Sequence, residues 1–512
     1  MAEYIVQDTT LSGIADAIRA KTGSAEPITL SQMASEIEGI EGGVAEDTLG
    51  QYWNRTLVSY SNDTITTVGK DAFSFFDQLT DITLTKCETI GISAFHSCTS
   101  LVNATFPVCT SIGSSAFTIC YSLTSVSFPV CTHIGTDAFG LCSALLDANF
   151  PQCVRVEAYA FDRCTSLQSA DFPVCSYIGT GAFSGCHSLT YANFPQCDTV
   201  GINAFTRCEQ LSDVVLTNCS YVDGGAFISC SSLINVNLPQ CVSVSNAAFR
   251  DCTSLTNINL PECQLIGESA FLSCTSLSII DLPKCTKINN CAFENCISLV
   301  EANLPQCTSL AYGAFKNCTN LISVYLDTLS KVGIEAFAKC TSLKTVSLTV
   351  CTNIDNGAFS ECTQLSSINL PNCAFIGNGA FEKCTQLTDV NIPLCTTISN
   401  YAFSGCTNLS TVYAPMCADV ALGAFQDCVN LTTISLPSCR ALYGDAFNGC
   451  TNLSAIILAS TSMCWLNGVS GFTNTPNAMV YVPSSMLSVY RENVGWNDHL
   501  SRLAAIEDMP TT

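Results

Sequence analysis

The chain repeats itself every 22 residues over most of its length. Phenylalanine recurs eighteen times in strict register, from Phe73 to Phe447, without an insertion or a deletion. A fixed period in this range is typical of a solenoid, in which one unit cannot bury its own apolar face and does so only against its neighbours. The repeat therefore predicts an elongated stack of coils, and any function has to be carried on the surface of that stack.

Each repeat also predicts where a coil is extended and where it turns. In the copy that begins at Phe95, Leu101 lies six residues on, Ala104 nine and Phe106 eleven, and Pro107 follows. Positions nine and eleven of an extended strand point to the same side, so we expect them to face the core and position ten to face outward. Proline lacks an N–H donor and ends the strand. The Ala-Phe segment is expected to form a tight helical or 3₁₀ turn on the other side of the coil.

These patterns predict an α/β or mainly-β solenoid with small helical pieces at both ends. The array is expected over residues 66–458 as eighteen coils, about 5 Å apart, which makes a rod on the order of 90 Å long. Residues 43–65 are interpreted as an irregular linker and N-terminal cap, and residues 459–512 as a C-terminal cap. An exposed end of a solenoid is an open sheet edge, so caps are needed.

Residues 1–42 do not repeat and show helical spacing of apolar side chains in two short stretches. We predict a small helical attachment segment that docks on a partner or self-associates, with a loosely attached cap on the array as the alternative. The apolar positions assigned to attachment are Leu11, Ile14, Ile18, Met33 and Ile37.

The C-terminal segment contains a strand pattern followed by helical spacing. Val480 to Pro483 predicts a final strand, and Ser484 or Ser485 is the expected cap of a helix that follows. A second amphipathic helix is expected to cover the last coil. Its apolar positions are Trp496, Leu500, Leu503 and Ile506.

Of the 35 cysteines, 33 follow the repeat. One column lies three residues after all but the first repeat phenylalanine, as in Cys98, and a second lies fourteen residues after most of them, as in Cys109. Spacing in phase with the core predicts free thiols that pack as small apolar groups. Stacked coils also lie within disulfide reach, so disulfides remain the alternative, with at least one thiol unpaired. No C-x-x-C pair occurs and a straight column does not form a tetrahedron, so we expect no metal site and no cofactor.

The formal charge is −23, from 19 basic and 42 acidic residues. This balance argues against a nucleic-acid partner and against an anionic membrane surface, because both require clustered lysine and arginine. The sequence contains no run of eighteen apolar residues, so we predict no membrane insertion. The first residues also lack a basic start followed by an apolar core, so we expect synthesis in the cytoplasm without a secretory signal.

An active site requires different reactive groups at one point, and the sequence does not predict one. The four histidines, His96, His133, His187 and His499, fall in different columns or in the cap. No phosphate-binding loop, H-E-x-x-H or G-x-S-x-G motif appears. We predict that the protein is not an enzyme.

The outward strand position is rich in asparagine. Stacked amides can hydrogen-bond to one another along the array, which is a structural role. The functional alternative is an amide-rich face for glycan hydroxyls or for a protein, with tyrosines as anchors in a broad, shallow contact. The candidate binding residues are Asn149, Asn193, Asn237, Asn259, Asn303, Asn369, Asn391, Tyr191, Tyr325 and Tyr413.

The repeat as a whole, Ala-Phe-x-x-Cys-x-x-Leu-x-x-Val-x-Leu-Pro-x-Cys-x-x-Ile-Gly, resembles the BspA-type, or Treponema-type, leucine-rich repeats. The resemblance covers about three quarters of the chain. It implies a leucine-rich-repeat solenoid and a role in surface adhesion or protein binding. The second cysteine column departs from many members of that family.

The two ends carry a second resemblance. Residues 11–23 are similar to the opening of tail and fibre proteins from phages and prophages of Gram-positive gut bacteria, and residues 480–496 to the closing cap of such repeat proteins. This resemblance implies a virion structural protein attached through residues 1–42 to other virion proteins. Its rod would meet a host cell-surface glycan or protein, with self-association left open. The alternative is a BspA-like adhesion or protein-binding protein at a bacterial cell surface or outside the cell.

Overall fold

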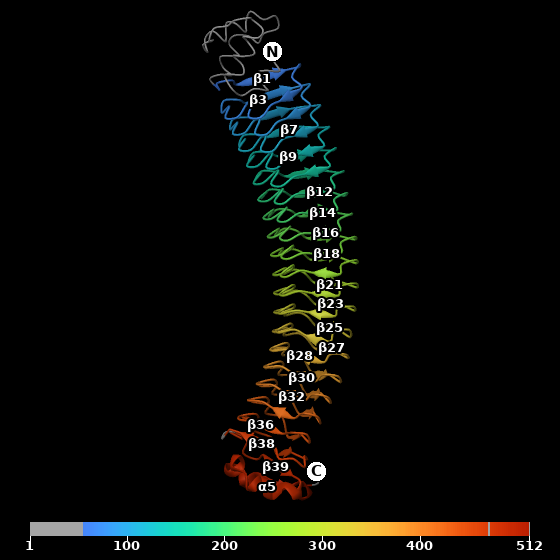
Figure 1. Ribbon diagram of the computed structural model, residues 1–512, viewed down its shortest axis with the longest axis vertical. Helices are drawn as coiled ribbons and strands as arrows, with labels where there is room; N and C mark the ends of the chain where they lie inside the picture. Colours follow the sequence, from blue (N-terminus) through green and yellow to red (C-terminus); the bar gives the residue numbers. More distant parts are fainter. Residues whose placement is uncertain (1–54, 469–471, 511–512) are drawn as a thin grey trace, which may run out of the picture. The chain divides into compact units, whose positions relative to one another are not determined.

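The computed structural model describes residues 55–468 and 472–510. The described residues form two compact units, which are considered separately: those up to residue 241 together with 248–259, and residues 242–247 together with those from residue 260 onward. Within each unit, successive coils follow one another in chain order (Figure 1). The attachment positions predicted in residues 1–42 lie outside the described residues. The solenoid fold class predicted from the 22-residue repeat is confirmed.

A first ladder of parallel strands runs along each unit. Most neighbouring strands pair at an offset of 22 residues, as in Asp81 with Asn103 and Asp389 with Thr411. In the first unit its strands are β1 Ser59–Asn62, β3 Asp81–Leu84, β5 Asn103–Thr105, β7 Ser125–Ser127, β9 Asp147–Asn149, β11 Ser169–Asp171, β13 Tyr191–Asn193, β15 Asp213–Val215, β17 Asn235–Asn237 and β19 Asn257–Asn259. In the second they are β21 Ile279–Asp281, β23 Glu301–Asn303, β25 Ser323–Tyr325, β27 Thr345–Ser347, β29 Ser367–Asn369, β31 Asp389–Asn391, β33 Thr411–Tyr413, β35 Thr433–Ser435, β37 Ala455–Ile457, β39 Met479–Val482 and β40 Leu503–Ala505.

A second ladder consists mostly of two-residue strands around the isoleucine or valine that lies seventeen residues after the repeat phenylalanine. In the first unit these strands are β2 Thr67–Val68, β4 Thr89–Ile90, β6 Ser111–Ile112, β8 His133–Ile134, β10 Arg155–Val156, β12 Tyr177–Ile178, β14 Thr199–Val200 and β16 Tyr221–Val222. In the second unit they are β18 Ser243–Val244, β20 Leu265–Ile266, β22 Lys287–Ile288, β24 Ser309–Leu310, β26 Lys331–Val332, β28 Asn353–Ile354, β30 Phe375–Ile376, β32 Thr397–Ile398, β34 Asp419–Val420, β36 Ala441–Tyr443 and β38 Trp465–Asn467.

The core consists of the columns predicted from the repeat. Phe95, Cys98 and Leu101 are fully buried, and so are Phe106 and Cys109 on the other side of the coil. The inward residue of each first-ladder strand is also buried in most coils, as Val236 is between Asn235 and Asn237. The apolar groups of one coil therefore lie against the same groups of its neighbours, as the repeat predicts.

The Ala-Phe segment is not the helical or 3₁₀ turn that we predicted. It is a run of tight turns in which alternate N–H groups leave the coil: Ser93 donates to Ser114 O in the next coil, whereas Ala94 donates to Gly91 O in its own turn. Ser93 and Ser97 adopt left-handed φ angles of 53° and 59°. A helix would satisfy all these donors internally. The coil instead gives half of them to its neighbour, which joins successive coils.

Both thiol columns are buried, and their sulfur atoms find backbone acceptors in two different ways. In the first column the thiol donates to the carbonyl oxygen of the phenylalanine 25 residues earlier, as Cys98 does to Phe73 O at 3.0 Å. In the second it donates within its own coil, as Cys109 does to Ser111 O at 3.3 Å. All 35 cysteines are free thiols, and only Cys291 is partly exposed. The prediction of small buried thiols in phase with the core agrees with this arrangement.

We expected residues 43–65 to be irregular, but residues 59–62, at the N-terminal end of the described chain, are regular. They form β1, which pairs with β3 in the same 22-residue register. The ring of Tyr60 lies 5.6 Å from that of Phe73. An aromatic side chain outside the repeat pattern thus covers the first repeat phenylalanine, and the ladder gains one further strand.

At the C-terminal end, the predicted strand at Val480–Pro483 is β39, but it is not the last. The first helical stretch, η1 Ser484–Met486 and α5 Leu487–Arg491, has no side-chain cap, so the expected serine cap is wrong. The second helix ends at Arg502: η2 Val494–Arg502 is followed by β40, which pairs with β39, and by η3 Ile506–Asp508. Leu503 therefore lies in a strand that closes the ladder.

Candidate interaction surface

The surface formed in each unit by the outward first and third residues of the first-ladder strands is here called the strand face. The inward middle residue of each strand fixes this orientation, because side chains alternate along an extended chain. In β17 and β31 the pattern is exposed, buried, exposed. The surface therefore follows directly from the repeat.

The asparagines of the strand face hydrogen-bond from coil to coil. Asn259 Nδ2 donates to Asn237 Oδ1 at 2.8 Å, and Asn391 Nδ2 donates to Asn369 Oδ1 at 2.7 Å. Aspartate takes the acceptor role elsewhere: Asn193 donates to Asp171 and Asn303 to Asp281, both at 2.7 Å. These pairs therefore form the hydrogen bonds between stacked side chains that we predicted as the structural role of this column. Exposed members such as Asn149 and Asn237 also keep amide groups facing solvent.

The three tyrosines do not share one column. Tyr325 and Tyr413 are the third residues of β25 and β33, whereas Tyr191 is the first residue of β13, in the other unit. Tyr325 is 56% exposed and Tyr413 57%. They are 88 residues apart, which is four coils, so they do not form one pocket. The arrangement is suited to separate anchor points on a broad surface.

The strand face is acidic in the first unit. Asp81, Asp147 and Asp213 occupy first positions of its strands, and Asp171 a third position. A hydrogen bond from Asn103 Nδ2, at 2.7 Å, lowers the pKa of Asp81. No lysine or arginine occupies a first or third position of the first-ladder strands described in this unit.

The histidines do not form a catalytic group. Nδ1 of His96 contacts Ser97 Oγ at 3.0 Å, and Nδ1 of His187 lies 3.7 Å from Glu209 Oε1. His499 packs edge-on against Phe472 in the C-terminal cap, and burial lowers its pKa. Among the residues described, no group of three or more histidine, cysteine or carboxylate side chains could hold a metal ion.

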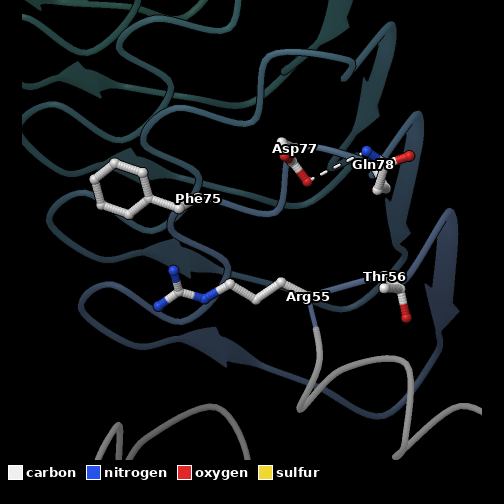
Figure 2. A pocket seen from close by; sticks show the side chains of 5 residues that line it. All are labelled: Arg55, Thr56, Phe75, Asp77 and Gln78. Carbon is white, nitrogen blue, oxygen red and sulfur yellow. Dashed lines mark hydrogen bonds between the residues drawn. The ribbon is translucent and has the colours of Figure 1, made fainter.

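A hollow of about 570 Å³ lies at the start of the described chain, lined by Arg55, Thr56, Phe75, Asp77 and Gln78 (Figure 2). The guanidinium carbon of Arg55 lies 5.8 Å from the centre of the Phe75 ring. Gln78 Nε2 donates to Asp77 Oδ1 at 3.5 Å. These side chains include a cation, a carboxylate, an amide and the hydroxyl group of Thr56.

Sequence reasoning missed the structural role of the threonines. Their hydroxyl groups donate to the carbonyl oxygen of the residue 22 positions earlier, as in Thr363 to Thr341 O at 3.1 Å. A further asparagine column, nineteen residues after the repeat phenylalanine, accepts from backbone N–H groups: Asn378 N donates to Asn356 Oδ1 at 2.8 Å. Both columns are visible in the sequence once residues are aligned by the repeat.

No helix in the described part of the chain combines the length and apolar character needed to cross a membrane.

The chain matches a family described as "BspA type Leucine rich repeat region (6 copies)", in overlapping segments that together run from residue 56 to residue 493. No curated protein matches the sequence significantly.

Solved structures with similar coils include a leucine-rich repeat protein from Bacteroides ovatus, with 19% identity over 88% of this chain and 92% of that one and a TM-score of 0.28. A leucine-rich cell surface protein from Faecalibacterium prausnitzii has 20% identity over 70% of this chain and 87% of that one, with a TM-score of 0.26. A leucine-rich repeat protein of T. pallidum has 22% identity over 43% of this chain and 78% of that one, with a TM-score of 0.23.

Proposed function

This chain belongs to the BspA-type leucine-rich repeat family, and from that membership we propose that it is a non-enzymatic binding protein that meets its partner through the strand face. Repeat proteins of this kind bind through extended surfaces rather than through one pocket. The partner is a protein or a glycan outside the cell that makes the chain. Surface adhesion or protein binding is the role that the family resemblance implies.

The observation that carries this proposal is the exposure of Tyr325 and Tyr413 on the strand face of the second unit, where the other outward residues are mostly asparagine, serine, threonine and carboxylate side chains. The two tyrosine side chains are more than half exposed, and they replace the asparagine that fills the same position in β23 and β31. Tyrosine supplies a large contact area at little cost in conformational entropy, which is why it is enriched in binding surfaces. Asn303 and Asn391, directly beside them, offer amide donors and acceptors.

Binding to the strand face can be tested with full-length protein applied to a printed glycan array and to a panel of displayed extracellular protein domains. The double variant Tyr325→Ala/Tyr413→Ala should lose most binding to any ligand found and should keep its melting temperature. Tyr443→Ala is the matched control, because Tyr443 is 41% exposed but lies in the second ladder. Equal binding by the double variant and the wild type would place the contact elsewhere.

The finer assignment, a virion fibre attached through residues 1–42, remains a prediction from the resemblance of the chain ends. Family membership favours the cellular alternative, a surface adhesion or protein-binding protein. The two can be separated with a chain that lacks residues 1–42. A virion fibre requires this segment for incorporation into particles, whereas a free surface protein retains binding without it.

A further inference from the structure

At the C-terminal end of the array, the cysteine column that lies fourteen residues after the repeat phenylalanine shifts its position. Cys395, Cys417 and Cys439 follow one another at 22 residues, but position 461 is threonine and the next cysteine of this side is Cys464. The strands shift as well. Ala441 pairs with Trp465 at an offset of 24 residues, whereas Asp419 pairs with Ala441 at 22.

This shift places two sulfur atoms against each other. The Sγ atoms of Cys439 and Cys464 are 3.2 Å apart and fully buried. Their backbones are held together, because Trp465 N donates to Arg440 O at 2.8 Å. Cys439 keeps the acceptor typical of its column, Ala441 O at 3.5 Å, whereas the nearest backbone acceptor of the Cys464 thiol is Trp465 O at 3.9 Å.

Two residues of the C-terminal cap form hydrogen bonds with the backbone of Cys464. Its backbone N–H donates to Tyr490 Oη at 2.8 Å, and its carbonyl oxygen accepts from Trp496 Nε1 at 3.0 Å. Tyr490 and Trp496 are completely buried, and their rings meet edge to face at 5.3 Å. Cys464 is therefore held on both sides of its backbone by buried aromatic residues of the cap.

We propose that Cys439 and Cys464 are a disulfide site. Exchange with a small-molecule disulfide such as oxidised glutathione joins their two sulfur atoms, and this bond links the cap covalently to the last regular coil. The sulfur atoms have only about 1.2 Å to close to reach bonding distance. The link stabilises the cap wherever the surroundings are oxidising, and the cap is held by hydrogen bonds and packing alone where they are reducing.

The chemistry is two successive thiol–disulfide exchanges. The thiolate of one cysteine attacks a sulfur of the oxidised glutathione, forms a mixed disulfide and releases one glutathione thiolate. The thiolate of the second cysteine attacks the protein sulfur of that mixed disulfide and releases the other. The two cysteines lose two protons and two electrons, and the glutathione disulfide takes up both electrons to become two thiols.

Burial makes the reaction depend on opening of the cap. The contact with the Cys464 thiol, together with desolvation, raises the pKa of Cys439, so the reactive thiolate is disfavoured while the cap is closed. Opening exposes both sulfur atoms to the reagent, and closing returns them to the separation at which the second exchange takes place. Formation of the link therefore reports on cap motion.

The test uses reduced full-length protein incubated with oxidised glutathione, either without denaturant or in urea just below its unfolding midpoint. Unreacted thiols are then alkylated in the unfolded state, and the digested protein is analysed by mass spectrometry. We expect a peptide pair joined through Cys439 and Cys464, lighter by two hydrogen atoms and alkylated at neither cysteine. Formation only in urea supports the role of cap opening, and formation in both conditions supports the site equally.

Two variants serve as matched controls. Cys464→Ser should abolish the link, and Cys417→Ser, one regular coil away, should retain it. Trypsin should cut at Arg491 in the cap more slowly in oxidised than in reduced wild-type protein, with no such difference in Cys464→Ser. Recovery of Cys439 and Cys464 alkylated under both conditions, or Cys439 linked to Cys417 as often as to Cys464, overturns the proposal.

Discussion

The ring of Phe161 lies parallel to that of Phe139, the residue 22 positions before it, with ring centroids 5.1 Å apart and ring planes 9° apart. Phe183 repeats the same contact on the other side at 5.1 Å. Each ring in the column is thus sandwiched by its neighbours, and the stack of phenylalanines runs along the core of the unit.

Phe161→Ala should lower the free energy of unfolding by about 3 to 5 kcal/mol, because it removes a fully buried ring and leaves a cavity between two coils. Contacts in a solenoid are nearly one-dimensional, so the damage should stay local and produce new protease cleavage near residue 161. Thermal melting and limited proteolysis measure both effects. Phe75→Ala is the control, because that ring is 53% exposed. If the two variants behave alike, the phenylalanine column is not the core.

The buried thiols predict a loss of stability in alkaline solution. Burial raises the pKa of Cys87 to about 11 and that of Cys109 to about 12, from an ordinary value of 9.0. Below pH 9 the thiols are protonated in both the folded and the unfolded chain. Between pH 9 and the raised values only the unfolded chain loses the protons, so stability falls as pH rises.

Each such thiol contributes a fall of about 1.4 kcal/mol per pH unit in this window. The urea midpoint, measured with a reductant present, should be level near neutral pH and drop above pH 9. The double variant Cys87→Ala/Cys109→Ala should show a shallower drop, since two of the contributing groups are gone. A midpoint that does not move on entering the alkaline range would contradict the burial of these thiols.

The threonine column predicts a stabilising substitution. Thr363, Thr385 and Thr407 each donate a hydroxyl to the carbonyl oxygen 22 residues earlier, at 3.1 to 3.4 Å, but Val429 occupies the next position. Val429→Thr should add a hydrogen bond to Thr407 O and raise the free energy of unfolding by about 0.5 to 1.5 kcal/mol. Thr363→Val should lower it by a similar amount. Chemical denaturation compares the two, and a loss of stability in both would refute the assigned bond.

The left-handed turn positions predict a second stabilising substitution. Ile119 has a φ angle of 67°, which is strained for a side chain branched at Cβ. Asn295 and Asn317 occupy the same position in other coils with φ angles of 62° and 61°. Ile119→Asn should therefore stabilise the protein by about 1 kcal/mol, and Asn317→Ile should destabilise it. A lower melting temperature for Ile119→Asn would show that packing of the isoleucine outweighs the backbone strain.

The sequence predicted the coils because their core positions are nearly invariant in spacing: Phe95 with Leu101, and Ala104 with Phe106, recur in phase wherever the chain is stacked. The turns were predicted wrongly because left-handed positions hold residues as different as Arg163 and Ile119. Bonds to the next coil impose the conformation there, and local sequence carries little signal of it.

The ends were harder to predict than the array for a related reason. Leu503 fits a helical spacing with Trp496 and Leu500, but the three-residue strand β40 is too short to show a periodicity of its own. For the binding surface, the repeat identified the outward positions and the amide pairs, yet nothing in the spacing names a partner. Tyr191 shows a further limit of the sequence pattern. That it lies in another column than Tyr325 and Tyr413 is visible only when each tyrosine is counted from the repeat phenylalanine of its own coil.

If the chain is a stack of 22-residue coils held in register, removing a whole coil and removing half a coil should have different effects on its stability. Removing residues 359–380 joins Ala358 to Phe381 and takes out one whole coil. Removing residues 359–369 instead joins Ala358 to Leu370, which keeps a plausible local pattern because cysteines recur every eleven residues, but takes out half a coil.

The measurement is the thermal unfolding of both variants, followed by circular dichroism. We predict that the 22-residue deletion unfolds cooperatively with a melting temperature close to that of the wild type, because every remaining ladder bond finds its partner. The 11-residue deletion should melt far lower or over a broad range, because a first-ladder strand then lies against a second-ladder strand. Equal tolerance of both deletions, or equal failure, would contradict the stacked register on which the core, the strand face and the cap depend.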